Sequence, residues 1–468
     1  MVNFCSQRLS RARGTSVRRK IFLRPCRFLT FIFVLVTTST AAESWKAGVA
    51  RVDITPKESI WLAGYASRKK PSEGVRQRLH LKALALEDSA GVVSVLVTAD
   101  LGGFRADVTK QIVRRVTATH GLARERFVLN ASHTHSGPIT TVNRYSTYPL
   151  NDQHKEAILR YQAQLIDNVV KVIGEAIGNR EAATLSYRLG LAGFAVNRRR
   201  VGHPEYPGPT DHDVPVLAVK KTDGSLLAIA FGYACHATVL SDYQINGDWP
   251  GYAQEAIEKR HPEAVALFVN GCSADQNPLP RRKVELAQRY GDTMAIAVDD
   301  VLKRAMRPIG GPLRAAFDEV ALPFRVPTEE ELKGRLNDKN RRVREHAERL
   351  LKILAAGGDL MRAYPYPIHV WRFGEDLTFI GLAGEVVVDY SIRFKRAYGA
   401  RNTWVSAYND DVFSYVPSLR VLKEGGYEGG GAMLFGTLPG PFRAAVEETL
   451  VEKVDELVRR AGGSPDQE

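Results

Sequence analysis

The stretch Phe127-Val128-Leu129-Asn130-Ala131-Ser132-His133-Thr134-His135-Ser136-Gly137-Pro138 places two histidines two residues apart, directly after a short apolar run. The apolar run is typical of a buried strand, and because side chains alternate along a strand, we expect His133 and His135 on the same face. The Gly-Pro pair ends the strand. Strand ends that open into loops are where α/β proteins place functional groups, so the two imidazoles indicate a metal site. A pair of structural histidines is the alternative interpretation.

Apolar runs alternate with helical patterns along most of the chain. The expected strands are residues 81–86, 92–99, 127–130, 214–219, 226–234 and 264–269, and the expected helices are 154–177, 251–260, 284–304, 329–355 and 442–461. Several strands are apolar at every position, as in a sheet covered on both faces. The sequence predicts an α/β fold with a central mixed β-sheet covered by helices and the metal site at strand ends. We expect a single large domain in one or two lobes, and a charged helix at 329–349 that is solvated or, alternatively, forms a lid.

Residues 1–42 have the composition of a secretory signal peptide. They contain eight Lys or Arg and no acid, then an apolar run at 28–36, then small residues through Ala42. The apolar run is about half of the roughly 20 residues that a spanning helix needs, which disfavours the alternative of an uncleaved membrane anchor. We therefore predict a secreted or periplasmic protein that is cleaved near Ala42, with residues 43–468 as the mature domain.

The charge of the chain excludes a nucleic-acid partner. The first 42 residues hold eight of the 65 Lys and Arg and none of the 52 Asp and Glu, so the net charge of residues 43–468 is only +5. No stripe of basic and aromatic residues remains in that region. Its two cysteines, Cys235 and Cys272, leave a disulfide open, because the spacing does not determine pairing. A small buried residue is the favoured interpretation of Cys235, although it lies beside a histidine.

Further polar groups follow apolar runs later in the chain. His236 closes the run 229–235, and Glu385 follows 379–384, where a buried carboxylate would be costly unless it were paired or bound to a metal. Two more polar segments, 268–278 and 404–415, follow the same pattern, and the second continues to residues 425–428. Asp100 and Asp248 are candidates either for orienting a ligating imidazole or for turns.

These motifs, in this order, resemble the neutral, non-lysosomal ceramidase family through nearly the whole mature sequence. The resemblance rests on residues 48–56, Gly64-Tyr65, Thr98-Ala99-Asp100 and, above all, 132–138. It implies zinc bound by His133, His236, Glu385 and Tyr415. It also implies that the amide of the substrate is contacted by His135, Arg198 and Tyr427, and the spacing of twelve residues between the two tyrosines is kept.

The chain departs from the family in two respects. Ceramidases have Gly-Asp-Val-Ser-Pro in the loop where this chain has Ala274-Asp275-Gln276-Asn277-Pro278, so Asn277 stands at the position of the serine regarded as the nucleophile. An amide side chain cannot replace a serine alkoxide, and Ser273 would need a shifted loop to do so. The chain also stops after the catalytic region, so we expect no C-terminal immunoglobulin-like domain.

A mechanism without serine follows from metal chemistry. Zinc lowers the pKa of bound water to about 7, which would supply a nucleophile at neutral pH. In this hypothesis His135 moves the proton to the leaving amine, Arg198 and Tyr427 stabilise the developing oxyanion, and Asn277 donates a further hydrogen bond.

We therefore predict a zinc-dependent hydrolase that cleaves the amide of ceramide or a related N-acyl compound. The alternatives are a zinc hydrolase of a non-lipid amide or ester, and a catalytically inert zinc-binding homologue. A merely structural metal has no need of oxyanion donors, which argues against the inert homologue. The resemblance alone suggests peripheral contact with a membrane, because no amphipathic helix with a basic face is evident. The sequence does not determine the oligomeric state.

Overall fold

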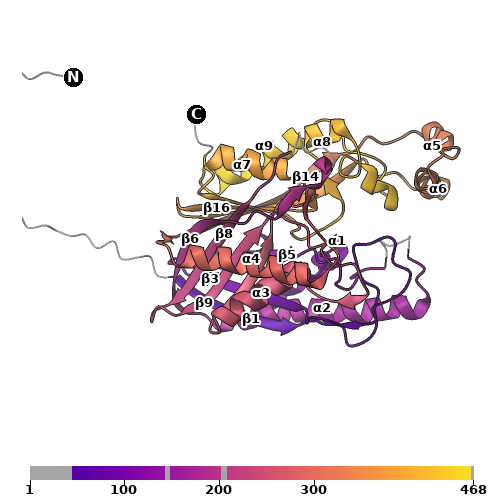
Figure 1. Cartoon of the computed structure of the whole chain (residues 1–468). Coiled ribbons are helices and arrows are strands. Elements are labelled where there is room, and N and C mark those ends of the chain that lie inside the picture. The colour runs from indigo at the N-terminus through magenta and orange to yellow at the C-terminus, as the bar shows by residue number, and fades with distance from the viewer. Residues whose placement is uncertain (1–44, 143–147, 202–207, 465–468) are drawn as a thin grey trace, which may run out of the picture. The chain divides into compact units, whose positions relative to one another are not determined.

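The computed structural model describes residues 45–142, 148–201 and 208–464 (Figure 1). Contacts divide the chain into two units, Met1–Ala41 and Ala42–Glu468, and all described residues belong to the second. The predicted signal segment lies outside the described residues. Over the ranges that are described, no helix is both long enough and apolar enough to cross a membrane.

The larger of two main sheets has nine strands among the described residues. Its hydrogen-bonded order is β11-β9-β8-β6-β1-β3-β4-β5, and β13 pairs with β6. The pairs β11–β9 and β4–β5 are parallel, and the other pairs are antiparallel. The strands are β1 (Trp45–Asp53), β3 (His80–Glu87), β4 (Val93–Ala99), β5 (Phe127–Ala131), β6 (Glu181–Leu191), β8 (Asp213–Lys221), β9 (Leu226–Tyr233), β11 (Val265–Asn270) and β13 (Arg307–Ile309).

A second sheet covers one face of the first. It consists of β14 (Leu313–Pro323), β15 (Ala363–Phe373), β16 (Leu377–Leu382) and β18 (Thr403–Ser406), in that order. Large apolar side chains of both sheets form one buried cluster, in which Trp45 and Leu96 come from the first sheet and Trp371, Phe379 and Trp404 from the second. Each aromatic side chain of this cluster buries about 150–250 Å² of surface, which stabilises the contact between the sheets.

Helices cover the outer faces of the two sheets, which gives four layers. Helices α1 (Ala106–His120) and α2 (Asp152–Gly178) share one core with the half of the larger sheet that holds β3, β4 and β5. Helices α3 (Asp248–Arg260) and α4 (Val284–Leu302) share another core with β8, β9 and β11. Helices α7 (Val388–Tyr398) and α9 (Val446–Arg460) cover the second sheet, and α8 (Leu419–Glu424) lies near them (Figure 1).

The predicted α/β fold with a central mixed sheet is confirmed, and each of the six expected strands is present. The second sheet was not predicted, and it takes the place of helices on one face of the first. The expected helix 329–355 is two helices, α5 (Glu329–Arg335) and α6 (Arg341–Ala355). They are separate because the Asn340 side chain accepts a hydrogen bond from Arg342 N and so starts a new helix. The described part of the expected helix 442–461 is shortened to α9, since Phe442 forms a β-bridge with Phe324.

The larger sheet curls so that its two edge strands meet at their C-terminal ends. Asn270, the last residue of β11, donates its backbone N–H to Asn130 Oδ1 of β5 (2.9 Å). The Asn130 amide in turn donates to Ala407 O (2.8 Å) and Asn409 Oδ1 (3.0 Å), just beyond β18. Asn130 and Asn270 are fully buried. One side chain thus ties together the ends of three strands from both sheets.

A buried charge cluster supports the same region. The carboxylate of Asp410 accepts hydrogen bonds from Arg124, from His369 Nε2 on β15 (2.7 Å) and from Leu129 N on β5 (3.3 Å). Burial opposes the charge of Asp410, but the Arg124 guanidinium and His369 lower its pKa to about 2. Asp410 therefore remains ionised and links the two sheets.

We expect Asp410→Asn to lower the free energy of unfolding by about 3 kcal/mol at pH 7, since it leaves the Arg124 charge without its partner. A carboxyl whose pKa is depressed on folding stabilises the protein above its unfolded pKa, about 3.9, and this contribution is lost as the pH falls through the folded value near 2. Urea titrations of the metal-free proteins at pH 7 and pH 3 measure the difference. Asp318→Asn, which removes two solvent-accessible ion pairs with Lys453 and Arg460, is the control. An equal difference between wild type and Asp410→Asn at both pH values would contradict the assignment.

Candidate functional site

Three acceptor atoms meet where strands of the two sheets end. His133 follows β5, His236 follows β9, and Glu385 begins the short strand β17 (Glu385–Val386) after β16. Glu385 Oε2 lies 3.2 Å from His133 Nε2 and 3.3 Å from His236 Nε2. All three residues are buried. The sequence prediction thus placed these three side chains correctly at the ends of strands.

Backbone carbonyls orient both imidazoles. His133 Nδ1 lies 2.6 Å from Gly102 O, and His236 Nδ1 lies 2.5 Å from Ser273 O. Because a carbonyl only accepts hydrogen bonds, each Nδ1 carries the proton and each Nε2 turns a lone pair toward Glu385. This is the arrangement in which metal-binding histidines are usually held.

The protonation states of these groups suit a cation. Burial and the charge of Arg198 lower the pKa of His236 to about 4, so this imidazole is neutral at pH 7. Burial opposes the charge of Glu385, but the two imidazoles hold its pKa well below its usual range. Two lone pairs and a carboxylate then face one another in a buried space, which is unfavourable unless a cation lies between them. The donor set of two imidazoles and one carboxylate fits a metal ion.

A second set of metal ligands would include His135. Its Nε2 lies 3.2 Å from His133 Nε2, and the ring nitrogens of His133, His135 and His236 all lie within 4.8 Å of one another. However, His135 Nδ1 has no hydrogen-bond partner within the described part of the chain. No carbonyl or carboxylate therefore fixes the ring of His135 for a metal, in contrast to the other two histidines.

Two further residues shape the space around the histidines. A Cβ atom on Gly64, which has a φ of +91°, would lie 2.2 Å from His135 Cγ, so only glycine fits against this ring. The Tyr408 ring lies 4.5 Å from the His133 ring, centre to centre, and both residues have φ near +60°. Such conformations of non-glycine residues cost about 1–3 kcal/mol each and occur mainly at functional sites. Gly64 lies in the Gly64-Tyr65 motif and Tyr408 in the polar segment 404–415, but neither residue was predicted to shape the site.

Tyr415, Arg198 and Tyr427 lie together beside Glu385. Strand β19 (Tyr415–Val416) pairs with β17, so that Tyr415 is the partner of Glu385. The Arg198 guanidinium carbon lies 5.4 Å from the centre of the Tyr415 ring and 5.9 Å from that of Tyr427. Arg198 Nη2 is buried and has no hydrogen-bond partner among the described residues. Burial and Glu385 raise the pKa of Tyr415 well above its usual value, so its hydroxyl keeps its proton when no cation is bound.

Asn277 belongs to the same region through a small pair of strands. Strand β12 (Gln276–Pro278) pairs with β7 (Ala195–Asn197), which leads directly into Arg198. Gln276 O accepts a hydrogen bond from His236 N (3.0 Å). Asn277 is 6% exposed, and its Oδ1 lacks a hydrogen-bond partner among the described residues. Strand β12 therefore contacts the backbone of His236 through Gln276 and pairs with the strand that leads into Arg198.

Other candidate residues from the sequence have structural roles. Asp100 accepts hydrogen bonds from His80 N (2.9 Å) and Gln254 Nε2 (3.0 Å), and Asp248 accepts them from Val239 N and Leu240 N. Asp100 thus connects the end of β4 to β3 and α3, and Asp248 stabilises the loop before α3, whereas backbone carbonyls orient the imidazoles. The cysteines of residues 235 and 272 are buried free thiols, and burial raises the pKa of each well above its usual value.

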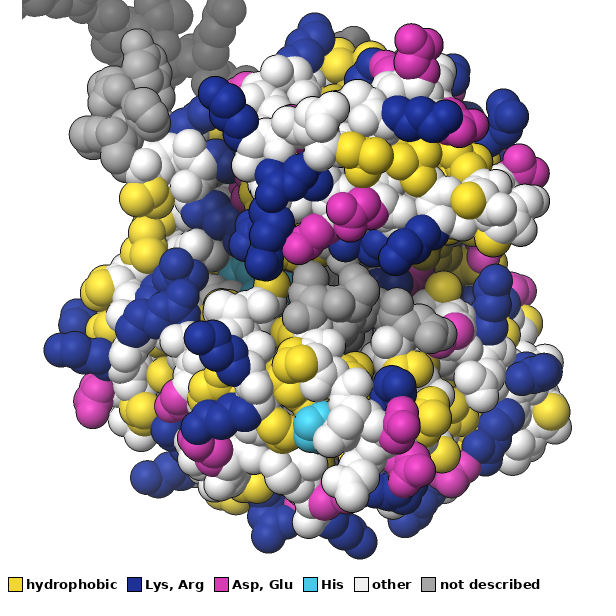
Figure 2. All heavy atoms as spheres, turned by 90° about the vertical axis from the view of Figure 1, so that its right-hand side faces the viewer, with side chains coloured by type: hydrophobic (Ala, Val, Ile, Leu, Met, Phe, Trp, Pro, Cys, Tyr) yellow, Lys and Arg dark blue, Asp and Glu magenta, His cyan; other side chains and the backbone are white. Residues whose placement is uncertain are grey.

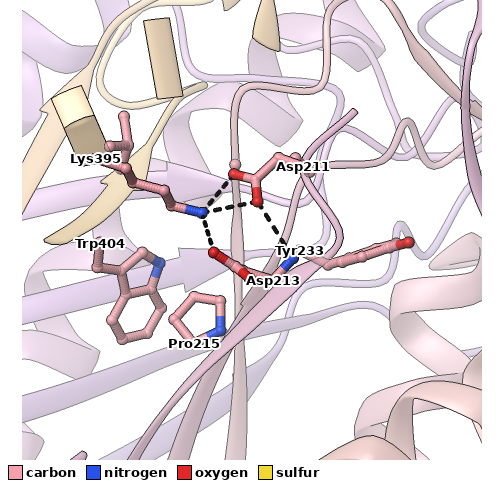
Figure 3. Close-up of a pocket in the computed structure, with 9 residues that line it drawn as sticks. Asp211, Asp213, Pro215, Tyr233, Lys395 and Trp404 are labelled. Atoms are coloured by element: carbon pink, nitrogen blue, oxygen red, sulfur yellow. Dashed lines mark hydrogen bonds and ion pairs between the residues drawn. The ribbon is translucent and has the colours of Figure 1, made fainter. Parts of the chain in front are cut away.

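The surface of the molecule has a hollow (Figure 2), and a small pocket lies elsewhere in the fold. Figure 2 shows a hollow on one face, with a histidine side chain at its floor and Lys and Arg side chains around its rim. A separate small pocket is lined by Asp211, Asp213, Lys395 and Trp404, among others (Figure 3). Lys395 Nζ lies 2.7 Å from both carboxylate oxygens of Asp211 and 2.8 Å from Asp213 Oδ2. Lys395 of α7 thus forms ion pairs with Asp211 and Asp213, and these ion pairs attach α7 to the start of β8.

The fold and the site define the chain as an α/β protein with a buried histidine and carboxylate centre beside an arginine. A family model, described as neutral/alkaline non-lysosomal ceramidase, N-terminal, matches residues 45–277. The chain belongs to this ceramidase family.

Proteins of the same kind are found among sequences and solved structures. The neutral ceramidases of Drosophila melanogaster and Drosophila pseudoobscura pseudoobscura are 24% and 25% identical over 252 residues, half of this chain. The match covers 35% of the length of each of these relatives. The crystal structure of neutral ceramidase from Pseudomonas aeruginosa has a TM-score of 0.70 and 21% identity, covering 90% of this chain and 75% of that one. A structure titled as a ceramidase complexed with C2 has a TM-score of 0.69 and 20% identity, covering 91% and 76%.

Substitutions can show which of the two sets of residues binds the metal. We expect His236→Ala and Glu385→Gln to lose the bound metal, with affinity falling by more than the roughly 100-fold that loss of an outer hydrogen-bond partner costs. We expect His135→Ala to retain the metal, because no described group fixes the second nitrogen of its ring. Metal content after dialysis, measured by atomic emission, gives the result, and His212→Ala is the control because His212 Nε2 bonds only Ala195 O. Equal loss in His135→Ala and His236→Ala would instead make the three histidines the ligand set.

Proposed function

We propose that this chain is a zinc-dependent amidohydrolase that cleaves the amide bond of ceramide or a related N-acyl lipid. The observation that carries the proposal is the convergence of two imidazole lone pairs and the Glu385 carboxylate near Arg198, whose Nη2 has no hydrogen-bond partner among the described residues. A cation and an oxyanion are the two charges that such a site is built to hold. Membership of the ceramidase family supports hydrolysis of amides as the reaction.

The metal would be held by His133, His236 and Glu385, with Tyr415 as the fourth ligand that the family resemblance implies. When bound, zinc would act as a Lewis acid and lower the pKa of a coordinated water. The neutral His236 imidazole and the ionised Glu385 need no change of protonation to accept the ion.

The other residues act on the amide. Arg198 Nη2 and the hydroxyl of Tyr427 donate hydrogen bonds to the carbonyl oxygen as its negative charge grows. Burial and the neighbouring imidazoles hold the pKa of His135 well below its usual range. The neutral ring can therefore take a proton from the attacking water, and its protonated form is a strong acid suited to giving that proton to the leaving nitrogen. Asn277 has no nucleophilic atom and serves as a further hydrogen-bond donor.

One observation favours a second candidate, a zinc hydrolase that acts on a non-lipid amide or an ester. Asn277 is buried at the position where the resemblance places a serine in ceramidases, and its neighbour Gln276 accepts a hydrogen bond from His236 N. A different group at this point of the site changes what the site accepts. An inert homologue is disfavoured, because a buried arginine nitrogen without a partner among the described residues costs about 1–3 kcal/mol, and this cost is recovered only when a ligand binds.

We also propose that residues 1–42 direct export to the periplasm or the medium, in line with their basic and apolar composition. Contact with a membrane would then be peripheral, at the rim of the hollow where basic side chains gather (Figure 2).

The first test is release of fatty acid from ceramide in detergent by residues 43–468. We expect hydrolysis that chelation abolishes and that added zinc restores, because the nucleophile depends on the metal. His133→Ala is the inactive control. A zinc-loaded wild-type protein that leaves ceramide intact but cleaves other N-acyl compounds would establish the second candidate.

The role of Asn277 can be measured with Asn277→Ala and Asn277→Ser. If its amide donates to the oxyanion, Asn277→Ala lowers kcat by about 100-fold, the usual effect of losing one such donor. Asn277→Ser keeps a hydroxyl donor and is expected to retain more activity than the alanine variant. Equal activity of wild type and Asn277→Ala would show that Asn277 has no part in the reaction.

A further inference from the structure

A glutamate that the sequence analysis left without a role holds the arginine of the site. Glu428 is 4% exposed and follows Tyr427 in a glycine-rich turn. Its Oε1 accepts a hydrogen bond from Arg198 Nε (2.7 Å), and its Oε2 accepts one from Arg199 Nη1 (2.6 Å). Both carboxylate oxygens are thus bound by neighbouring arginines of the short 3₁₀ turn Arg198–Arg200.

The contact with Nε determines what Arg198 can offer to a substrate. A guanidinium is planar and rigid, so fixing Nε and the ring contact with Tyr415 fixes the direction of the remaining nitrogens. Of these, Nη2 is the buried atom without a hydrogen-bond partner among the described residues. A side chain with this many rotatable bonds would otherwise sample several orientations.

The turn that carries Glu428 is built around the same arginines. Gly425 and Gly426 have φ of +69° and +77°, and Gly425 O accepts a hydrogen bond from Arg199 Nη2 (3.0 Å). Glu424, on the other side of the turn, accepts hydrogen bonds from Arg199 Nη2 (3.1 Å) and Arg200 Nη2 (2.7 Å). None of the hydrogen bonds of Glu424 involves Arg198. The two acids therefore belong to one charge network, but only Glu428 touches the arginine of the site.

We propose that Glu428 is a positioning residue that aims Arg198 Nη2 at the carbonyl oxygen of the substrate amide. This inference rests on the proposed function. In this proposal Glu428 orients Arg198, whereas its neighbour Tyr427 contacts the substrate. Misplacement of a catalytic group by about 1 Å costs up to roughly 100-fold in rate, so loss of Glu428 affects turnover without removal of any group that touches the substrate.

The test compares Glu428→Gln and Glu428→Asp with Glu424→Gln in the zinc-loaded protein. Each Gln variant removes one negative charge from the same network, and Glu428→Asp keeps the charge but shortens the reach to Arg198. We expect Glu428→Gln to lower kcat for amide hydrolysis by about 10- to 100-fold with KM nearly unchanged, because Arg198 acts on charge that develops in the transition state. Glu428→Asp should lie between Glu428→Gln and wild type. Glu424→Gln should stay within about threefold of wild type.

Three further readouts separate positioning from a merely structural role. Zinc content and melting temperature should be alike in Glu428→Asp and Glu424→Gln. Arg198→Ala combined with Glu428→Gln should be no worse than Arg198→Ala alone, because the two residues act as one unit. Equal kcat losses in Glu428→Gln and Glu424→Gln, or additive losses in the double variant, would overturn the proposal.

Failure of the proposed function would give a different pattern. A wild-type protein that hydrolyses no amide contradicts that function, and binding of dodecanoate, a fatty-acid anion like the expected product, then tests the positioning role. Weaker binding in both Arg198→Ala and Glu428→Gln, with Glu424→Gln unchanged, supports positioning of Arg198 for an oxyanion. Binding that is equal in Glu428→Gln and Glu424→Gln overturns it.

Discussion

The buried side-chain amide of Asn130 holds together the strand ends on which the rest of the site depends. Its oxygen accepts the backbone N–H of Asn270, and its nitrogen donates to Ser406 Oγ, Ala407 O and Asn409 Oδ1. These bonds tie the C-terminal ends of β5, β11 and β18 together, although β5 and β11 lie at opposite edges of the same sheet. His133 lies three residues beyond Asn130, and the loop that presents Ser273 O to His236 begins just after Asn270. A fully buried amide with all its bonds made is costly to disturb, so the positions of the histidines depend on this junction.

The local parts of the site were predictable from the sequence, whereas its connections were not. An apolar run followed by a polar residue correctly placed His133, His236 and Glu385 at strand ends, because burial and strand periodicity are properties of a few neighbouring residues. The curl of the sheet depends on Asn130 meeting Asn270 across 140 positions, and no local pattern encodes such a contact. The second sheet was missed for a related reason. Only three of the eleven residues of strand β14 are buried, and it lacks the continuous apolar run that marked the other strands. Glu428 was missed although its signal was present, since three consecutive arginines require carboxylates wherever they are buried.

The site has two halves of opposite charge, and one half affects the protonation of the other. On one side, the neutral imidazole of His236 and an ionised Glu385 present acceptors and negative charge. On the other side, Arg198 presents a donor and positive charge, held by Glu428. Arg198 lowers the pKa of His236 and so helps to keep that imidazole neutral, which links the state of the acceptor half to the presence of the arginine. Ionised groups of opposite sign that face one small space suit a reaction in which a nucleophile attacks a carbonyl carbon. In such a reaction negative charge moves from the nucleophile to the carbonyl oxygen.

The unsatisfied atoms around this space argue for a ligand more strongly than any single residue does. His135 Nδ1, His236 Nε2, Glu385 Oε2, Arg198 Nη2 and Asn277 Oδ1 are all buried without a hydrogen-bond partner in the described residues. Each such atom costs about 1–3 kcal/mol when it remains unpaired, and the left-handed backbone of His133 and Tyr408 adds to this cost. A fold that needed these residues only for stability would gain from replacing them with apolar side chains. Their concentration at one junction of strand ends therefore indicates that the free energy is recovered on binding, by a cation on the histidine side and by a polar substrate on the side of Arg198 and Asn277.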